Sequence, residues 1–517
     1  MLLRALPWAA LAAALTFMAL HSLALQEDRW IPDDTYITLR FADNLAAGHG
    51  PVYNPGERVE GYTNFLWMAL LAGGHALGGN LENLSQVYGI VFSSATLVLL
   101  ALTPWIVPGL GFGACAAAIL LLGSCGVFTI YATAGMEVPL LHFLITLALV
   151  LHFRSRQCPE GLVLPLVAGL MCALAAMTRP DAVLVAGVLG CDRLAHAVRT
   201  RTIARLGAFA GAFAVIFGLY FLWRMNYYGH LLPNTFYAKV GGEAAQMTVG
   251  LDYVSSFAGA TFVTLALAVG ASLSGGAFGE NRPVRGVLLG LLCLYTVYIV
   301  LVGGDFMPGF RFFAPIYPAL CLLAGMTLQH RARWAPAAGA LLLAAIIYNV
   351  LMLPSHRDMR RASAGNVSRK GEIVGQWLAE HAPERALLAT NTAGSIPFFS
   401  GLRTIDMLGL CDEHIAHRDL TFGRRTPGHG KGDGAYVLSR KPDYIQFGSA
   451  SGTEKPKFRG DAEIYTHPQF KQNYVLKKYR MPSRGTLRLY VRKPAAGGKG
   501  IDAKPYAATP FRTEKDK

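Results

Sequence analysis

The sequence predicts an α-helical polytopic membrane protein with about 11 spans and a re-entrant or juxtamembrane segment, followed by a C-terminal soluble α/β domain. Of its 517 residues, 53% are hydrophobic and 15% are charged, and the mean hydropathy is +0.36. An ordinary soluble chain carries roughly 25% charged residues. Apolar runs of the roughly 18 residues that indicate a membrane helix recur from Leu6 to about Leu353 and then stop. We therefore expect a transmembrane body over 1–353, a folded domain over 354–495 and a disordered tail over 496–517.

The first apolar run, Leu6–Leu25, is expected to remain as an uncleaved span. Its apolar core is long, and no clear small-x-small cleavage site precedes Gln26. The stretch Phe65–Leu77 is short for a span and suits a re-entrant or interfacial segment. The ten further spans are expected at approximately 84–106, 111–130, 137–153, 162–178, 180–191, 207–224, 248–272, 285–303, 313–328 and 335–353.

Short loops that are rich in Lys and Arg tend to stay in the cytoplasm, and four such loops predict the orientation. They are Arg154–Arg156, the stretch from Arg193 to Arg205, Arg282–Arg285 and Arg331–Arg333. This orientation places the loop 26–62 and the C-terminal domain outside. The spans at 162–178 and 180–191 are interrupted by Arg179-Pro180. Such a break is tolerated only where protein or a cavity covers the freed backbone, so it points towards a site.

The net charge of +15 fits basic cytoplasmic loops that face anionic lipid, together with a basic C-terminal region. No nucleic-acid-binding motif competes with that interpretation, so we expect the lipid bilayer as a partner and no nucleic acid. The chain contains no Gly-x-Gly-x-x-Gly, no Walker loop and no Gly-x-Ser-x-Gly. Six of the eight cysteines lie in apolar segments, Cys158 lies in a short loop and Cys411 is alone in the C-terminal domain, so we expect packing residues and no disulfide within that domain.

The external loop after Leu25 concentrates ionisable residues beside the membrane. Ile37, Phe41 and Leu45 recur at helical spacing, which predicts a short amphipathic helix on the bilayer with Asp33 or Asp34 near its N-cap. An adjacent carboxylate pair can serve as a general base, because mutual repulsion and partial burial raise the pKa of a carboxyl group. The alternative is a capped surface helix whose charges are solvated.

Four other segments placed outside also carry polar groups at the membrane edge. They are Ala134–Glu137, Thr178–Asp181, Tyr227–Asn234 and Gly303–Arg311. Ionisable residues there are costly and mark either a site or its paired structure. The cations expected to converge on this face are Arg40, Arg179, His230, Lys239 and Arg311. Cations at that depth suit a phosphate whose other end is a lipid. The alternative is that Arg179–Asp181 and Asp305–Arg311 are internal ion pairs that hold the spans together.

The C-terminal domain alternates helical and strand patterns. We expect a helix at Gly371–His381 and strands at Arg385–Thr390, Arg403–Leu408, Asp443–Phe447, Tyr474–Tyr479 and Thr486–Val491. Such a small α/β domain would lie outside, over the cavity. Acceptor recognition, closure of the cavity and a purely structural role all remain open for it.

The string DDTYITLRFADNLAAGHGPVYNPGERVEGYTNFLW resembles the first external loop of the GT-C superfamily of polytopic glycosyltransferases, which use polyprenyl-phosphate sugars. Within that group it is most similar to the terminal arabinofuranosyltransferases of mycobacterial cell-wall synthesis and their bacterial relatives. The similarity continues through MTRPDAVL, YYGHLLPNTFYAK, GGDFMPGFRFFAPIYP and TAGSIPFFSGLRTIDMLGLCD, and so covers about residues 30–415. The first motif is long and specific, and the others support it.

The resemblance implies roles for individual residues. Asp33 matches the acidic residue that is taken as the family's catalytic base, and Asp34 is its neighbour, acting as second base, acceptor contact or metal contact. Arg179, His230 and Arg311 sit in matching motifs and are phosphate partners by this comparison. The other donor- or acceptor-binding candidates are Arg40, His49, Glu57, Arg58, Glu60, Tyr62, Asn64, Asp181, Asn234, Lys239 and Asp305.

The resemblance implies transfer of a sugar from a polyprenyl-phosphate donor to a cell-envelope glycan or glycolipid acceptor. A pentofuranose such as arabinofuranose is the sugar it favours, and the outer face of a bacterial plasma (inner) membrane is the place. No cofactor is required by the motifs, although a divalent cation is left open. The alternative functions are a lipid-linked-glycan transporter or flippase and a glycan ligase.

Overall fold

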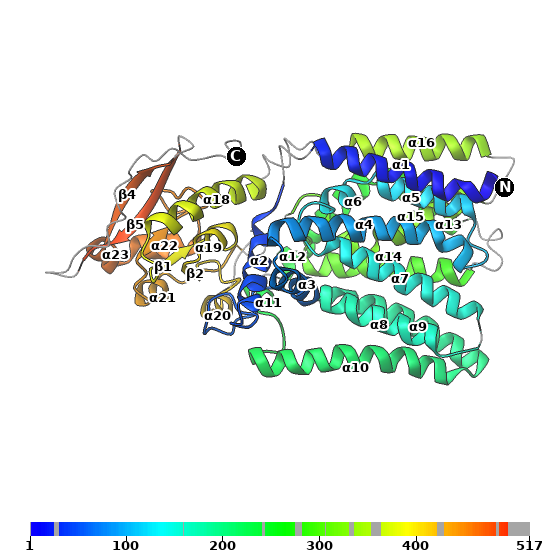
Figure 1. Ribbon diagram of the computed structural model, residues 1–517, viewed down its shortest axis with the longest axis horizontal. Helices are drawn as coiled ribbons and strands as arrows, with labels where there is room; N and C mark the ends of the chain where they lie inside the picture. Colours follow the sequence, from blue (N-terminus) through cyan, green and yellow to red (C-terminus); the bar gives the residue numbers. More distant parts are fainter. Residues whose placement is uncertain are drawn as a thin grey trace.

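The computed structural model describes residues 2–24, 30–158, 160–239, 243–273, 282–305, 307–329, 335–352, 363–420, 429–481 and 485–494. Figure 1 shows a bundle of long helices at one end and a smaller domain containing the β-sheet, residues 363–494, at the other. We call these parts the helical body and the C-terminal domain. The tail predicted at 496–517 and part of the segment that joins the two parts lie outside the described residues.

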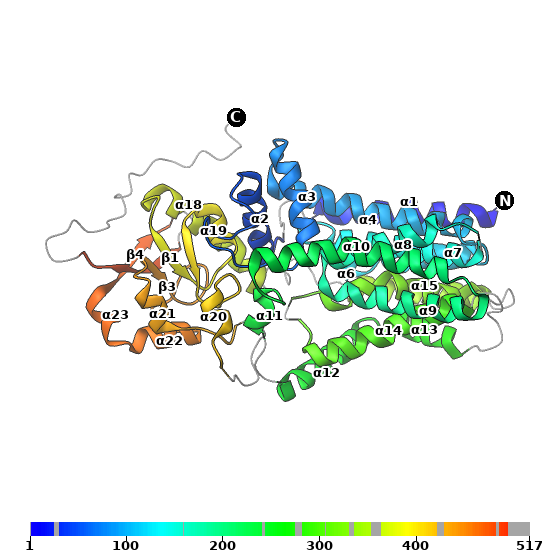
Figure 2. The same cartoon turned by 90° about the horizontal axis from the view of Figure 1, so that it is seen from below.

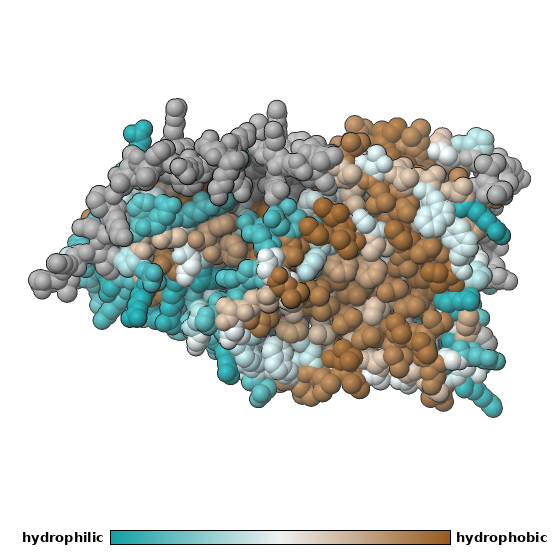
Figure 3. Space-filling model, in the orientation of Figure 1, coloured by the Kyte–Doolittle hydropathy of each residue, from teal (hydrophilic) through white to brown (hydrophobic). Residues whose placement is uncertain are grey.

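Among the described residues, five helices of the body are long and apolar enough to cross a membrane by themselves. They are α1 (Leu2–Ala24), α4 (Leu81–Ile106), α7 (Val138–Gln157), α10 (Ile203–Tyr228) and α14 (Arg282–Val302). Helices α12 (Glu243–Ala260) and α13 (Phe262–Leu273) meet at a bend of 85° and together give a sixth candidate. Figure 3 shows the hydrophobic surface spread over this bundle, whereas the C-terminal domain is mainly hydrophilic.

Shorter helices complete the body. They are α3 (Phe65–Ala76), α5 (Phe112–Gly123), α6 (Gly126–Tyr131), α8 (Val163–Thr178), η2 (Pro180–Ala182), α9 (Val183–Thr200), α11 (Asn234–Lys239), η4 (Arg311–Ile316), α15 (Tyr317–Gln329) and α16 (Ala335–Leu351). Each range predicted as a span coincides with a helix or a helix pair of the body, which confirms a polytopic helical protein. The number of about 11 spans stays a prediction, because several of these helices are shorter than a membrane crossing requires.

The C-terminal domain is a five-stranded sheet between two helical layers. Its strands are β1 (Leu387–Thr390), β2 (Arg403–Asp406), β3 (Tyr444–Gln446), β4 (Tyr474–Arg480) and β5 (Thr486–Arg492), in the order β2-β1-β3-β5-β4. β1 pairs in parallel with β2 and β3, and β5 pairs antiparallel with β3 and β4. All five strands and the helix at 371–381 were predicted, and the structure confirms them.

Alternate side chains of the strands enter two separate cores. On one face, Leu388 and Tyr444 pack with Trp377 of α18 (Ser363–His381). On the other, Ile405 and Ile445 join a core with the helices that follow. Those helices are α20 (Glu413–His417), α21 (Gly434–Ser439), α22 (Arg459–Thr466) and α23 (Pro468–Asn473). The two-residue period of a strand accounts for this division.

Helix α2 (Asp33–Ala46) forms where the apolar spacing predicted it, with both acidic residues in its first turn. Its surroundings differ from the prediction, because residues Thr35–Ala42 are all buried. Figures 1 and 2 both place α2 between the helical body and the C-terminal domain. The alternative of a capped surface helix whose charges are solvated is therefore wrong, because protein covers most of α2. Its position on the bilayer stays a prediction.

The string Asp406–Leu410 forms a tight loop after β2. The fully buried Asp406 carboxylate accepts hydrogen bonds from the Leu408 and Cys411 backbone N–H groups, at 3.0 and 2.8 Å. The loop then meets the body, where Asn234 donates to the carbonyls of Gly409 and Leu410 at 2.9 Å. Burial raises the pKa of Asp406 to about 7, and the backbone hydrogen bonds only partly oppose that effect.

This pKa predicts that stability falls as pH rises. A carboxyl group with a higher pKa in the folded state contributes stability in its protonated form, which is complete below about pH 4 and lost as pH passes about 7. Replacing Asp406 by Asn should flatten the dependence of the thermal midpoint on pH between those values. It should also cost about 1–3 kcal/mol, because one backbone N–H loses its acceptor. An unchanged pH slope in the purified variant would contradict this account.

Candidate active site

The two acidic residues at the start of α2 have different environments. The Asp33 carboxylate accepts hydrogen bonds from the backbone N–H groups of Gly394 and Ser395, at 2.9 and 2.8 Å, and from the Ser395 hydroxyl. These donors belong to the start of α19 (Ser395–Ser400) in the C-terminal domain. Burial raises the pKa of Asp33, and these hydrogen bonds oppose the rise. Asp33 therefore binds the body to the C-terminal domain.

Arg40, two turns further along α2, makes the same connection. Its buried guanidinium donates to the carbonyl oxygens of Tyr53 and Leu402, both at 2.7 Å, and to that of Pro397. It also donates to the Asn54 side chain at 3.2 Å. The planar fork of a guanidinium is suited to several carbonyl acceptors at once. Arg40 thus fixes α2, the loop that follows it and α19 together.

The loop after α2 adds further contacts with β2. Asn54 and the backbone of Thr404 exchange two hydrogen bonds, at 2.8 and 3.1 Å. Glu57 forms ion pairs with Arg403 and, at 3.3 Å, with Arg440. The Tyr53 hydroxyl donates to the Ala393 carbonyl at 2.6 Å. We call this set of contacts, made by Asp33, Arg40, Tyr53, Asn54 and Glu57 with the C-terminal domain, the interdomain clasp. Most of the loop that was predicted to surround the reacting groups therefore holds the two parts of the molecule together.

A second group of charges lies where the broken span predicted it. Arg179, between α8 and η2, donates to both oxygens of Asp181, at 3.0 and 3.2 Å, and pairs with Glu137 at 3.5 Å. The other oxygen of Glu137 accepts from Asn64 at 3.1 Å. All of these side chains are at least nine-tenths buried. The extended backbone of Arg179 after α8 turns its side chain towards the junction with α2.

Arg311 and Lys239 complete this cationic cluster. Arg311 pairs with Asp305 at 2.7 Å and lies within electrostatic range of Arg179. Burial lowers the pKa of the Lys239 ammonium group, and the charge of Arg311 lowers it further, whereas Asp34 and Asp305 raise it. The Asp34 carboxylate therefore lies within electrostatic range of Lys239, while that of its neighbour Asp33 is hydrogen-bonded to the C-terminal domain. Consecutive residues of a helix point about 100° apart, which accounts for the division.

The end of the first loop is anchored on α10. Glu60 accepts from Arg224 with both carboxylate oxygens at 2.8 Å, and Asn234 donates its backbone N–H to the Glu60 carbonyl at 3.1 Å. The hydroxyls of Tyr62 and Tyr228 lie 3.0 Å apart. These buried contacts fix the position of α11, and hence of Lys239, relative to α2.

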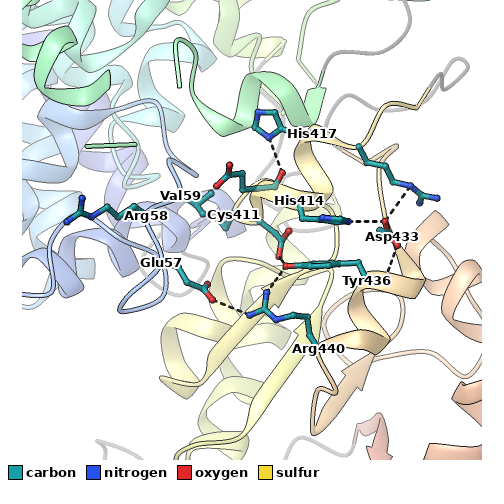
Figure 4. Close-up of a pocket in the computed structure, with 12 residues that line it drawn as sticks. Glu57, Arg58, Val59, Cys411, His414, His417, Asp433, Tyr436 and Arg440 are labelled. Carbon is teal, nitrogen blue, oxygen red and sulfur yellow. Dashed lines mark hydrogen bonds and ion pairs between the residues drawn. The ribbon is translucent and has the colours of Figure 1, made fainter. Parts of the chain in front are cut away.

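An open cleft of about 740 Å³ lies between the first loop and the C-terminal domain. Figure 4 shows its wall. Its lining residues are Glu57, Arg58, Val59, Cys411, Asp412, Glu413, His414, His417, Arg418, Asp433, Tyr436 and Arg440. The rings of His414 and Tyr436 are stacked 4.0 Å apart, and the Tyr436 hydroxyl donates to Asp412 at 3.1 Å.

The charges of the cleft largely pair with one another. Arg440 bonds Tyr436 and Glu57, and Arg418 pairs with Glu463 and Asp433. His230 of the body reaches the cleft wall, where its Nε2 lies 2.8 Å from Glu413. The cleft therefore presents carboxylates, guanidinium groups, the Tyr436 hydroxyl and aromatic ring faces, and its opposite charges nearly balance. Such a surface suits a neutral, hydroxyl-rich ligand better than an anion.

The structure brings together only part of the predicted site. Asp34, Asn64, Arg179, Asp181, Lys239, Asp305 and Arg311 belong to one cluster at the junction. Glu57, Arg58 and His230 face the cleft. Glu60 and Tyr62 bond to α10. Asn234 of α11 bonds to the loop 406–412 after β2, which we call the Cys411 loop. Asp33 and Arg40 lie in the interdomain clasp, and His49 is exposed in the turn after α2.

Three features of this region were not predicted from the sequence. They are the role of Arg224, the ion pair of Glu137 with Arg179, and the cleft residues of the C-terminal domain. An arginine within the apolar run of α10 was the available signal for Arg224, because an ionisable residue there needs a partner. No sequence pattern could identify the cleft residues, because tertiary contacts decide where the segments that carry them lie. Within the described ranges, no group of three or more His, Cys, Asp or Glu residues is arranged to hold a metal ion.

Known proteins resemble this chain in sequence. A family model described as "Domain of unknown function (DUF8728)" matches residues 359–492. Over 331 residues the chain is 30% identical to a terminal β-(1→2)-arabinofuranosyltransferase of Mycobacterium tuberculosis and 28% identical to one of Corynebacterium glutamicum. The matches cover 57% and 56% of this chain but 52% and 47% of those relatives, so the chain matches about half of the length of each.

Solved structures resemble it in fold. Apo ArnT from Cupriavidus metallidurans superposes with a TM-score of 0.58 at 14% identity, covering 94% of this chain and 97% of that one. The same protein bound to undecaprenyl phosphate gives 0.53 at 14% identity, covering 77% and 85%. The arabinofuranosyltransferase AftD from Mycobacteria gives 0.52 at 14% identity, covering 97% and 40%.

The interdomain clasp predicts that Gly394 tolerates no side chain. A Cβ on Gly394 would lie 1.9 Å from the Asp33 carbonyl oxygen and 2.9 Å from its carboxyl carbon. Gly394→Ala should therefore push α19 away from α2, cost about 1–3 kcal/mol and speed hydrogen exchange at both segments. Gly401→Asn is the matched control at the other end of α19, since a Cβ there meets open space and Asn tolerates its positive φ. Equal exchange in both variants would contradict the clasp.

Proposed function

We propose that this protein transfers a sugar from a polyprenyl-phosphate donor to a cell-envelope glycan. The proposal rests on its GT-C glycosyltransferase fold and on its sequence similarity to terminal arabinofuranosyltransferases. The sugar we propose is a pentofuranose, arabinofuranose being the first choice, because both curated relatives carry that activity in their names. The site would lie on the outer face of a bacterial plasma membrane, on the side of the C-terminal domain.

The observation that carries this proposal is the cationic cluster beside Asp34. Lys239, Arg311 and Arg179 gather at the junction where the helical body meets α2, within reach of a lipid whose tail stays in the membrane. A phosphate there would meet cations that are already oriented by Asp305, Asp181 and Glu137. A related fold, ArnT, has been solved with undecaprenyl phosphate bound, which supports a lipid phosphate as the donor's leaving group.

Asp34 is the residue we assign as general base, with Asp33 as its positioning neighbour. The sequence-based hypothesis gave Asp33 the role of the base. Its carboxylate, however, already accepts three hydrogen bonds from Gly394 and Ser395, and an acceptor hydroxyl would have to compete with them. Asp34 makes no such set of hydrogen bonds among the described residues, and its carboxylate lies within electrostatic range of Lys239, beside which we place the phosphate. The clasp at Asp33 then fixes the first turn of α2 and hence the direction of Asp34.

The reaction follows from this arrangement. The acceptor hydroxyl oxygen forms a bond to the anomeric carbon while the bond from that carbon to the phosphate oxygen breaks. Asp34 takes the hydroxyl proton, and the negative charge that develops on the leaving lipid phosphate is stabilised by Lys239, Arg311 and Arg179. Because Arg179 and Arg311 are buried and held by carboxylates, little reorganisation of these two cations accompanies the step.

The cleft above the first loop is our candidate for the acceptor site. It opens between Glu57 and Tyr436, next to the Cys411 loop, and the Asp34 charge acts on Cys411. A glycan can place its C–H faces on the stacked His414 and Tyr436 rings and its hydroxyls on the carboxylates around them. This gives the C-terminal domain a role in acceptor recognition.

The two acidic residues give the first test of the proposal. Asp34→Asn should lower transfer from radiolabelled polyprenyl-phosphate arabinofuranose by roughly 100- to 10,000-fold, because the base is lost. Donor binding in nanodiscs should be unchanged. Asp33→Asn is the matched variant: it should lower transfer less and should also raise protease sensitivity between the body and the C-terminal domain, since a clasp contact is lost.

Two outcomes would overturn parts of this assignment. Full activity in Asp34→Asn, together with an inactive Asp33→Asn whose C-terminal domain stays protected, would return the base to Asp33. Failure of the wild type to use any monophosphate donor, under conditions where a related enzyme does, would reject the donor class.

The cleft gives a separate prediction. His414→Ala removes one of the stacked rings from a half-exposed position, so folding should be little affected. The KM for the acceptor should rise several-fold with kcat almost unchanged, because a ground-state contact is lost. Arg480→Ala, on the exposed strand β4 away from the cleft, is the control. An unchanged KM in His414→Ala would place the acceptor elsewhere.

A further inference from the structure

A second cluster of arginines lies at the opposite end of the helical body. It is formed where α7 ends, α9 ends and α10 begins, far from the C-terminal domain in Figures 1 and 2. Its members surround a small pocket lined by Ser155, Arg156, Arg193, His196, Thr202, Arg205 and Leu206. The reaction proposed above uses none of these residues.

Two of these arginines are buried and share one partner. Arg193 donates to the Ser155 hydroxyl at 3.0 Å, and Arg205 donates to the same hydroxyl at 3.1 Å and to the Ser155 carbonyl. Arg193 is 5% exposed and Arg205 is 8% exposed. Within the described residues, Arg193 Nε and Nη2 and Arg205 Nε are buried without any hydrogen-bond partner. Three strong donors are thus left unsatisfied beside one another.

The nearby charges do not neutralise them. The carboxylate of Asp192 is bound to Arg156 and, at 2.8 Å, to His152. The second nitrogen of the Arg156 fork lies 3.3 Å from His196. Among the lining residues and these partners, three guanidinium groups face a single carboxylate. The charges of Arg193 and Arg205 repel each other at this site.

Burying unpaired charge is costly, and leaving charged donors without acceptors costs several kcal/mol in general. An anion bound between the arginines would lower both the free-energy cost of the unpaired charge and that of the unsatisfied donors. The cavity between the arginines measures about 10 Å³, which is the size of one water or one oxygen atom. A single oxygen of a larger anion can therefore enter it while the rest of the group stays at the surface.

The surface around the pocket indicates what kind of anion this is. Leu194 and Val198 of α9 and Ile203 of α10 are exposed apolar side chains beside the cluster. Helix α10 is long and apolar enough to cross a membrane and is little buried within the protein, as expected of a lipid-facing helix, and Leu194 and Val198 extend this apolar surface onto α9. Basic pockets between helices at the membrane edge bind anionic lipid headgroups. We propose that Arg193 and Arg205 bind a phosphate oxygen of an anionic phospholipid whose acyl chains lie along α9 and α10.

In the test, the purified full-length protein in detergent is titrated with four probes. The thermal midpoint of unfolding is measured at each step, and bound lipid is detected by native mass spectrometry. The probes are phosphatidylglycerol, phosphatidylcholine, glycerol 3-phosphate and inorganic phosphate. Phosphatidylglycerol should raise the midpoint and remain bound, and the zwitterionic lipid should do so much less. Stabilisation by the two soluble phosphates to the same extent would show a free-phosphate site and overturn the lipid assignment.

The variants identify the residues. Arg193→Gln and Arg205→Gln should each weaken phosphatidylglycerol binding by on the order of tenfold, because each removes a buried charged hydrogen-bond donor from the phosphate oxygen. Arg199→Gln is the matched control, since Arg199 lies in the last turn of α9 but is exposed. If the Gln variants fail to fold, Arg193→Lys and Arg205→Lys are used instead. They keep the positive charge but lose the planar guanidinium with its several donors, and should bind phosphatidylglycerol with intermediate affinity. Binding that is equal in all variants and in the control would overturn the proposal.

Discussion

The contact between the first turn of α2 and the start of α19 is the constraint on which the arrangement of the site depends. Asp33 supplies acceptors for two backbone N–H groups and one hydroxyl that begin α19, and Arg40 supplies donors for carbonyls at its other end. Opposite charges on one helix thus complement both ends of a short helix in another domain. Because the backbones meet at Gly394, no side chain fits between them. The C-terminal domain is therefore fixed over the end of the helical body.

This constraint divides the first loop between two tasks. Asp33 and Arg40 of α2 bond to α19 and hold the domains together, whereas Asp34, about 100° around the helix from Asp33, lies within electrostatic range of Lys239. The same division recurs in the Cys411 loop, where Asp406 orders the backbone and Asp412 faces the cleft. Charged residues that are adjacent in sequence consequently serve different functions, one in docking and one in the proposed chemistry.

The sequence predicted the elements better than their surroundings. Apolar runs marked the helices of the body, and short strand-type runs marked the five strands, because both patterns are local consequences of burial. The local pattern of α2 also predicted a helix correctly, but not that a second domain covers its polar face. Two of the four acceptors of Arg40, the carbonyls of Pro397 and Leu402, lie more than 350 residues away. No short-range pattern can report such a contact, so Arg40 was assigned to ligand binding from its charge alone.

The two arginine clusters at opposite ends of the body differ in their charge balance. At the junction, Arg179 and Arg311 each have a carboxylate partner, and Glu137 adds another, so the cluster is stable when no phosphate is present. A phosphate bound there adds to an existing network and can leave it again, as turnover requires. At the far end, Arg193 and Arg205 share one serine and retain unsatisfied donors. The donors of such a site are all satisfied only while an anion is bound. This fits a tightly bound structural lipid better than a substrate that must be released.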